Sequence, residues 1–200
     1  MVVIVVLVTF VFIMMAWMPR EYRRSPRIDC VNNIKAVGMA ARVFANDHEE
    51  KFPWQVSTNR GGSMEFLNTR DVFRHFQTMS NDLPTPRVLV CAGDKQRRPA
   101  KKWKKEFMDN ERVSYFVGLD ARASSADWML CGDRNITGQT IRSNGILVST
   151  KDSSVTWTNG NHGTAGNIGF ADGSVMQMSR VALSNFIQSA VFTTNRLAIP

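Results

Sequence analysis

The 200-residue chain lacks the short motifs that mark common catalytic sites. It contains no Gly-x-Ser-x-Gly, no His-Glu-x-x-His, no phosphate-binding Gly-x-x-x-x-Gly-Lys loop and no Cys-x-x-Cys. The three histidines, His48, His75 and His162, are far apart in the sequence and form no metal-binding motif. We therefore expect a protein that is not an enzyme and that holds no metal or other cofactor.

Cysteine is scarce, and the number of cysteines is odd. Cys30, Cys91 and Cys131 cannot all pair within one chain. Cys91 and Cys131 occupy matching places in two similar apolar segments, VLVCAGD and WMLCGDRN. They could form a disulfide in an oxidising compartment if those segments are neighbouring strands. We expect instead that both are buried free thiols and that Cys30 is a core residue of the first helix.

Acidic residues are outnumbered by lysine and arginine, 17 to 25, and the net charge of +8 is unevenly placed. One stretch, residues 95–105, concentrates basic side chains and contains no acid: Lys95, Arg97, Arg98, Lys101, Lys102, Lys104 and Lys105. Such a patch could bind nucleic acid or anionic lipid head groups. A solvated loop or short exposed helix is the simpler interpretation, so we do not expect a nucleic-acid partner.

Charge is absent altogether from residues 1–19. Residues 2–18 would form a helix of about 25 Å, near the lower limit for crossing a bilayer. Trp17 lies where interfacial aromatic residues gather. A cleaved signal peptide is the alternative, but no basic segment precedes the run and no small-x-small site follows it. We expect a retained transmembrane anchor over residues 1–19 and a basic juxtamembrane segment over residues 20–27.

Helical patterns occupy residues 28–83 of the expected globular domain, which spans residues 28–200. Ser25 followed by Pro26 is a suitable start for the first helix. Apolar residues then recur at steps of three and four, at Ile28, Val31, Ile34, Val37, Ala41 and Phe44. A second helix fits residues 69–82 with Thr69 as its cap. His75 within it is expected to be partly buried or on the surface.

Short strand patterns follow over residues 86–180, leaving 181–200 as a C-terminal segment. The segments RVLVCAGD, VSYFVGLD, DWMLCGDRN, GILVST, SVTWTN, NIGFA and SVMQM are rich in β-branched and aromatic residues and are separated by turns. The predicted fold class is α+β, with an N-terminal hydrophobic helix and an amphipathic helix packed on an antiparallel β-sheet.

The stretch NHGTAGNIGFADGSV, residues 161–175, raises the question of a catalytic pair. Asp172-Gly173 between two strand patterns predicts a hairpin with a type I′ turn. His162 and Asp172 could otherwise form a proton relay or half of a metal site. Residues 167–172 alone would extend about 16 Å as a strand, so this pair requires the preceding GTAG to fold back. We expect the stretch to serve folding.

Two motifs together resemble those of type IV pilin-like proteins of planctomycetes and verrucomicrobia. DCVNNIKAVGMAARVFANDHEEKFP is similar to the segment that follows their hydrophobic helix, and residues 161–175 resemble their prepilin-processing-associated H-x9-D-G module. The resemblance implies a long N-terminal helix on an antiparallel sheet, exported across the inner membrane. It also implies that the motif residues, His162, Asn167, Phe170, Asp172 and Gly173, have no catalytic role.

The resemblance implies a structural or accessory pseudopilin-like component of a type II secretion or type IV pilus machine. Its expected partners are the membrane and other pilin-like subunits, with no small-molecule substrate. Two alternatives remain open: a DNA-binding minor pilin that uses residues 95–105, and a membrane-anchored hydrolase or metal protein that uses His162 and Asp172.

The chain departs from the family at its beginning, because it opens on MVVIVVLVTF without a basic leader and a Phe-Thr-Leu-Ile-Glu-Leu stretch. We expect the reading frame to extend upstream of Met1; otherwise the protein has lost processing.

Topology provides the first test. Arg20, Arg23, Arg24 and Arg27 would favour a cytoplasmic domain, whereas the resemblance implies a periplasmic one. We predict that a reporter active only in the periplasm is active when fused after residue 60. Strong activity of a cytoplasmic reporter at the same position would reverse the assignment.

Overall fold

The computed structural model describes residues 25–190 and 192–200, so the expected anchor and most of the juxtamembrane segment lie outside the described residues. The described chain is α+β, as predicted. Three helices, α2 (Pro26–Asp47), α3 (Val72–Gln77) and α4 (Arg180–Ser189), accompany eight strands: β1 (Tyr115–Gly118), β2 (Met129–Asp133), β3 (Ile136–Gly138), β4 (Ile146–Thr150), β5 (Val155–Trp157), β6 (Ala165–Phe170), β7 (Val175–Ser179) and β8 (Thr194–Ala198). Within the described residues, none of the helices is both long and apolar enough to span a bilayer.

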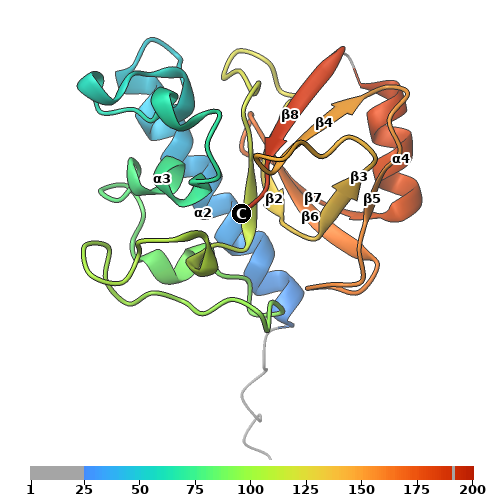
Figure 1. Ribbon diagram of the computed structural model, residues 1–200, viewed down its shortest axis with the longest axis horizontal. Helices are drawn as coiled ribbons and strands as arrows, with labels where there is room; N and C mark the ends of the chain where they lie inside the picture. Colours follow the sequence, from blue (N-terminus) through green and yellow to red (C-terminus); the bar gives the residue numbers. More distant parts are fainter. Residues whose placement is uncertain (1–24, 191) are drawn as a thin grey trace, which may run out of the picture.

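Six strands form one antiparallel sheet in the order β4-β8-β1-β2-β6-β7 (Figure 1). The remaining two, β3 and β5, form a small antiparallel pair. The last strand of the chain, β8, enters between β4 and β1 and pairs with both. The C-terminal segment, for which the sequence patterns specified no element, therefore supplies α4 and an interior strand of the main sheet.

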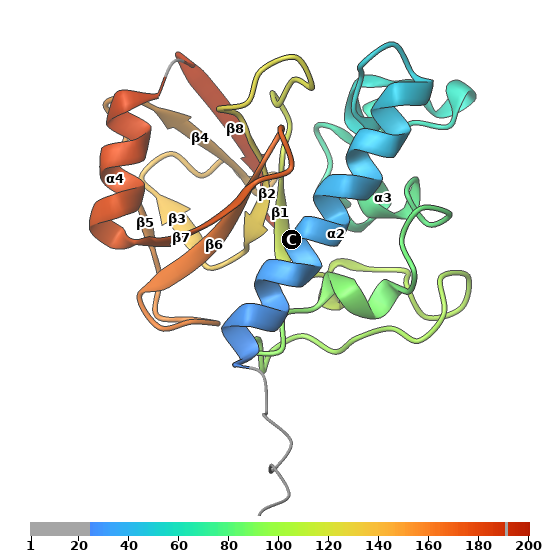
Figure 2. The ribbon, with the colours of Figure 1, turned by 180° about the vertical axis from the view of Figure 1, so that it is seen from behind.

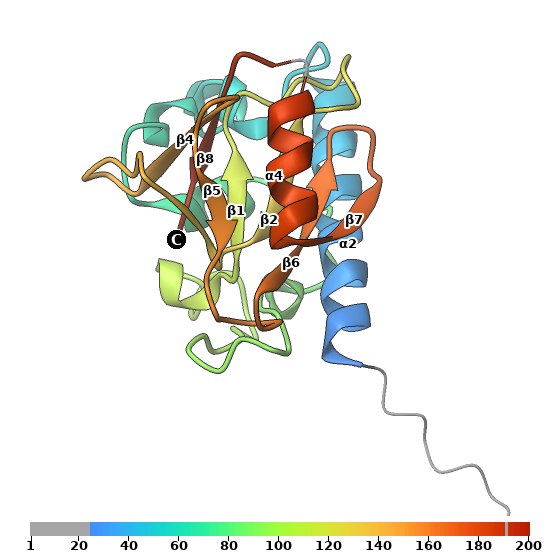
Figure 3. The same ribbon diagram turned by 90° about the vertical axis from the view of Figure 1, so that its right-hand side faces the viewer.

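The sheet separates two apolar cores, and successive side chains along its strands point alternately into one core and the other. On β1, Tyr115 and Val117 belong to the core beneath α2, whereas Phe116 between them belongs to the core beneath α4. Figures 2 and 3 show α2 on one face of the sheet and α4, with the β3–β5 pair, on the other. The long helix is thus one layer of a three-layer arrangement.

Helix α2 begins at the predicted residues. Pro26 occupies its first turn, and the carbonyl of Ser25 accepts the amide N–H of Ile28 and of Asp29. The predicted apolar stripe is buried at Ile34, Val37, Ala41 and Phe44, whereas Ile28 is 47% exposed. At the other end, the imidazole of His48 stacks on Phe44 and contacts its carbonyl oxygen through Nδ1.

The prediction of strands from residue 86 onward is wrong for its first part. Residues 86–114 contain two 3-10 turns, Pro86–Leu89 and Asn110–Arg112, and no strand. The hydroxyl of Thr85 caps the first turn by accepting the N–H of Arg87. Leu89 is fully buried in the same core as α2. The apolar residues of RVLVC are therefore buried as a loop beside the helix, which periodicity alone cannot distinguish from a strand.

The hairpin prediction is confirmed, and its turn type is corrected. Strands β6 and β7 pair antiparallel around Asp172-Gly173. Gly173 has φ +90°, but Asp172 is not among the residues with positive φ, as a type I′ turn would require. The amide of Gly173 bonds to the Phe170 carbonyl, and the amide of Phe170 bonds to the Ser174 carbonyl. This pattern is a three-residue loop with a glycine bulge.

Substitutions in this turn provide the second test. Gly173→Val places a β-branched side chain at a positive φ and should lower the free energy of unfolding by about 1–2 kcal/mol or more. Asp172→Asn should be nearly neutral, because an asparagine Oδ1 can still accept the Ser174 N–H that Asp172 now accepts. Thermal melts of both variants check the ranking; equal destabilisation would contradict this account of the turn.

Candidate functional site

The stretch 162–173 lies along helix α2 and contacts it at successive points. A Cβ on Gly169 would lie 2.6 Å from Cγ2 of Ile34, so only glycine allows this approach of the helix to β6. Further along, Arg42 donates through Nη1 to the Ala171 carbonyl at 2.7 Å. The glycines and the turn of the motif therefore form a platform for the helix.

A disulfide closes the N-terminal end of this contact. Cys30 of α2 is bonded to Cys91 of the loop that follows Pro86–Leu89, with Cα atoms 5.2 Å apart. Close by, Arg27 donates to the His162 carbonyl at 2.9 Å. Both expectations for Cys91 are wrong: it does not pair with Cys131, and it is not a free thiol, because it lies in a loop beside α2 and is bonded to Cys30. Cys131 is an unpaired, buried residue of β2.

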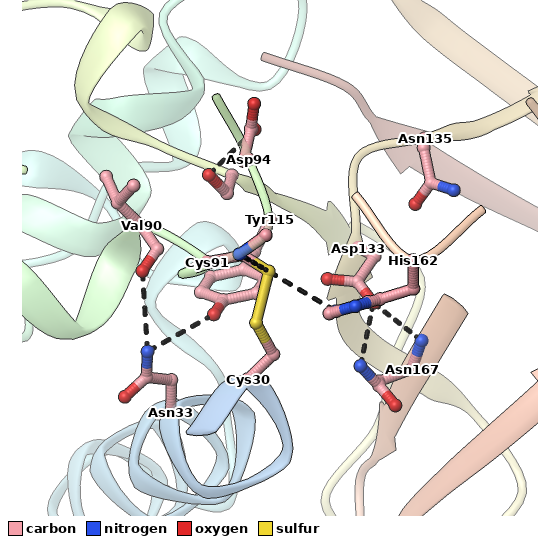
Figure 4. The surroundings of a disulfide bond; sticks show 12 residues. Cys30, Asn33, Val90, Cys91, Asp94, Tyr115, Asp133, Asn135, His162 and Asn167 are labelled. Atoms are coloured by element: carbon pink, nitrogen blue, oxygen red, sulfur yellow. Dashed lines mark hydrogen bonds and ion pairs between the residues drawn. A yellow bond between two sulfur atoms is a disulfide. The ribbon is translucent and has the colours of Figure 1, made fainter. Parts of the chain in front are cut away.

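His162 lies against this disulfide and not against Asp172. Its Nε2 is 3.3 Å from Sγ of Cys91 and 3.6 Å from Oδ2 of Asp133 (Figure 4). Gly93 permits this position, since a Cβ there would lie 2.3 Å from the Asn161 carbonyl oxygen and 3.3 Å from Cε1 of His162. Asp172 is exposed and accepts the Ser174 N–H. His162 and Asp172 therefore do not form a pair in the structure.

Asp133, the last residue of β2, is completely buried. Its Oδ2 accepts two hydrogen bonds from Asn167, one from the backbone N–H at 2.7 Å and one from the side-chain amide at 2.9 Å. Its Oδ1 has no hydrogen-bond partner among the described residues. Burial raises the pKa of Asp133 to about 7, although the bonds from Asn167 act in the opposite direction.

His162 shifts toward its neutral form. Burial, together with the positive charge of Arg27, lowers the pKa of His162 below its ordinary value. The 3.6 Å separation from Asp133 satisfies an ion-pair distance criterion, but burial favours the uncharged form of both partners. We conclude that the two groups are not held together as a strong ion pair.

The remaining motif residues have packing or hydrogen-bonding roles. Asn167 orients Asp133, and Phe170 is buried with its ring edge-on to Phe186 of α4. Gly173 provides the bulge of the turn. Among the described residues, no hydroxyl group lies within hydrogen-bond distance of His162.

A neighbouring acid, Asp94, forms a structural ion pair. Arg134 donates to both of its carboxylate oxygens, at 2.7 and 3.0 Å, and the Ser114 hydroxyl donates at 2.9 Å. Burial would raise the pKa of Asp94, but these hydrogen bonds and the Arg134 charge lower it overall. The pair joins the loop after Cys91 to the end of β2.

His75 is fully buried, contrary to the expectation of partial or surface exposure. Its Nδ1 lies 2.8 Å from the Ser63 hydroxyl, and burial lowers its pKa to about 4. It ties α3 to the preceding turns, far in sequence from His162.

The basic stretch 95–105 contains no helix or strand. Its five lysines and Arg98 are exposed, whereas Arg97 donates to the Pro200 carbonyl at 3.0 Å. Trp103 is half-buried with its ring edge-on to Phe107 at 5.0 Å. The one aromatic side chain of the patch therefore packs on the core, which favours the solvated-loop interpretation.

No protein-family model, curated protein or solved structure matches this chain. The cluster of disulfide, His162 and Asp133 must therefore be interpreted from its own geometry. Sequence patterns identified His162 but missed Asp133 as its neighbour. The available signal was an acid that directly follows the buried segment MLCG, where a carboxylate is rarely found without a partner.

The raised pKa of Asp133 provides a third test. In the unfolded chain its carboxyl ionises near 3.9, so the native state loses stability as pH rises from about 4 to about 7. Asp133→Asn removes this loss. We predict that the variant's free energy of unfolding, relative to the unmodified protein, rises by roughly 2–3 kcal/mol between pH 5 and pH 8.

The pKa values of His75 and His162 are lowered, so protonation of these residues destabilises the fold as pH falls. This effect is present in the Asp133→Asn variant and in the unmodified protein, and it largely cancels when their free energies of unfolding are subtracted. Asp127→Asn, in the exposed loop before β2, is the matched control and should leave the profile unchanged. Denaturant unfolding at several pH values checks the prediction; a pH-independent difference for Asp133→Asn would contradict it.

Proposed function

We propose that the chain is a membrane-anchored, pseudopilin-like structural subunit whose domain lies outside the cytoplasm. It acts as a component or accessory of a type II secretion or type IV pilus machine and not as an enzyme. Its partners are the membrane and other pilin-like subunits.

The observation that carries this proposal is the placement of α2. One side of the helix packs along the 162–173 platform, while three apolar residues of its outer side remain exposed: Ile28 (47%), Met39 (63%) and Val43 (47%). Their separations of eleven and four residues place them on one stripe. An apolar stripe on a helix that follows a long uncharged segment and a short basic one suits packing against the equivalent helix of a neighbouring subunit.

The disulfide supports an extracytoplasmic location. Disulfides such as Cys30–Cys91 persist in oxidising compartments and are rare in the cytosol. This agrees with the export that the motif resemblance implies, and it outweighs the arginines that follow the apolar segment.

The two alternatives gain no support from the described contacts. A hydrolase that uses His162 and Asp172 requires a pair that is not formed. At the basic patch 95–105, Trp103 is packed on Phe107, so the patch presents charge but no free aromatic side chain on which bases could stack.

A fourth test addresses the outer stripe of α2. Met39→Lys and Val43→Lys should each leave the fold within about 0.5 kcal/mol, because both side chains are exposed. A photo-cross-linking residue is placed at position 28. In the protein without a lysine substitution, it should form a cross-link to a pilin-like subunit or a second copy, identified by mass spectrometry. Both lysine variants should sharply reduce that product.

Val181→Lys is the matched control, since Val181 is 69% exposed on α4 at the opposite face of the sheet. It should cross-link like the unmodified protein. Equal yields in all three variants would exclude the stripe as the subunit contact.

A further inference from the structure

We infer that Cys30, Cys91, Asp133 and His162 form a zinc site when the disulfide is reduced. The same four residues would then exist in one of two states, an oxidised pair or a metal complex. This inference rests on the geometry of the cluster and is independent of the proposed structural role.

The four side chains provide the right kinds of donor at the right spacing. One ligand atom from each, two sulfurs, a carboxylate oxygen and an imidazole nitrogen, lies within 4.8 Å of all the others. Around tetrahedral zinc such donors are separated by roughly 3.3–3.8 Å. Breaking the S–S bond lets the two sulfurs separate to this spacing, so only small movements of the other two ligands are needed.

The surroundings of Asp133 are those of a metal ligand. The carboxyl group is fully buried, and its Oδ1 has no partner among the described residues. Two hydrogen bonds from Asn167 fix the carboxylate through Oδ2, the oxygen that lies 3.6 Å from Nε2 of His162. Outer-shell bonds of this kind orient ligands in metal sites. A bound cation would balance the negative charge of this buried carboxylate.

The cysteine side of the cluster is also prepared for a thiolate. The Gly93 amide already donates to Sγ of Cys91 at 3.3 Å, and Arg27 provides a positive charge beside His162. Figure 4 shows the disulfide and His162 facing each other with Asp133 beside them. The ligands come from α2, the loop around residue 91, the end of β2 and the loop before β6, so a metal here would join four separate segments.

A cavity lies beside the loop that carries His162. It is lined by the 93–96 loop, by residues 134–137 and by residues 158–161, which precede His162 in the chain. Gly93 and Asn161, on its wall, are the residues in close contact with the His162 loop.

Conversion of the disulfide state to the zinc complex requires a reductant and the loss of two protons. A dithiol transfers two electrons and two protons to the Cys30–Cys91 bond and is itself oxidised to a disulfide. The two cysteine thiols then release their protons to solvent as Zn²⁺ binds the thiolates. His162 binds as the neutral imidazole through Nε2, and Asp133 binds as the carboxylate.

The test uses the full-length chain in mild detergent and cobalt(II) as the probe. After reduction by a dithiol, which is removed before metal is added, the unmodified protein should show the intense visible and sulfur-to-metal bands of a tetrahedral thiolate site. The oxidised protein should show neither. Zinc should displace cobalt stoichiometrically.

Asp133→Asn and His162→Ala should each lower the cobalt affinity by at least about 10-fold, the scale typical of losses in metal-site residues. Cys131→Ala is the matched control, because Cys131 is a buried cysteine of β2 outside the ligand set, and it should bind like the unmodified protein. Absence of the tetrahedral spectrum in the reduced protein, or unchanged affinity in both ligand variants, would overturn the inference.

A second measurement needs no variant and so does not depend on the variants' folding. Zinc should protect Cys30 and Cys91 of the reduced protein from alkylation by at least about 10-fold in rate, mapped by mass spectrometry. Equal alkylation rates with and without zinc would contradict the site.

Discussion

The packing of α2 on the strand and turn of residues 162–173 is the contact on which the rest of the structure depends. Ile34 fits over Gly169, Arg42 holds the Ala171 carbonyl, and Cys30 is bonded to Cys91 at the N-terminal end. Burial of the inner face of this helix forms one of the two cores of the domain. The course of the loop of residues 86–114 depends on the same packing, since Leu89 and Cys91 are buried beside the helix rather than within the sheet.

This contact gives the histidine motif a physical role in packing. Its glycines allow a helix to approach β6 closely, and its Asp-Gly turn lies under the same helix. At one end, the same approach brings an imidazole, a buried carboxyl and two sulfurs into one small volume. The residues that hold the helix in place are therefore also those with the chemistry of a redox-dependent metal site.

Local chemistry explains which features were predictable from the sequence. Ser25-Pro26 and the apolar periodicity specified α2, and Asp172-Gly173 specified the hairpin. The type I′ assignment was wrong because Asp172 keeps a negative φ and places only Gly173 at a positive one. The Cys30–Cys91 bond and the Asp133–His162 contact join residues 61 and 29 positions apart, and no local pattern encodes such contacts. The interior position of β8 has the same origin, since its partners β1 and β4 lie far earlier in the chain.

The central claim is that α2 is fixed where Cys30 meets Cys91, at the His162 end of the motif. Non-reducing peptide mapping of the protein isolated from its own cells, with free thiols blocked at lysis, tests this most directly. The account predicts a Cys30–Cys91 cross-link and a Cys131 that reacts only after denaturation. A Cys91–Cys131 cross-link would contradict it, because Cys30 and its helix would then no longer be held at this position.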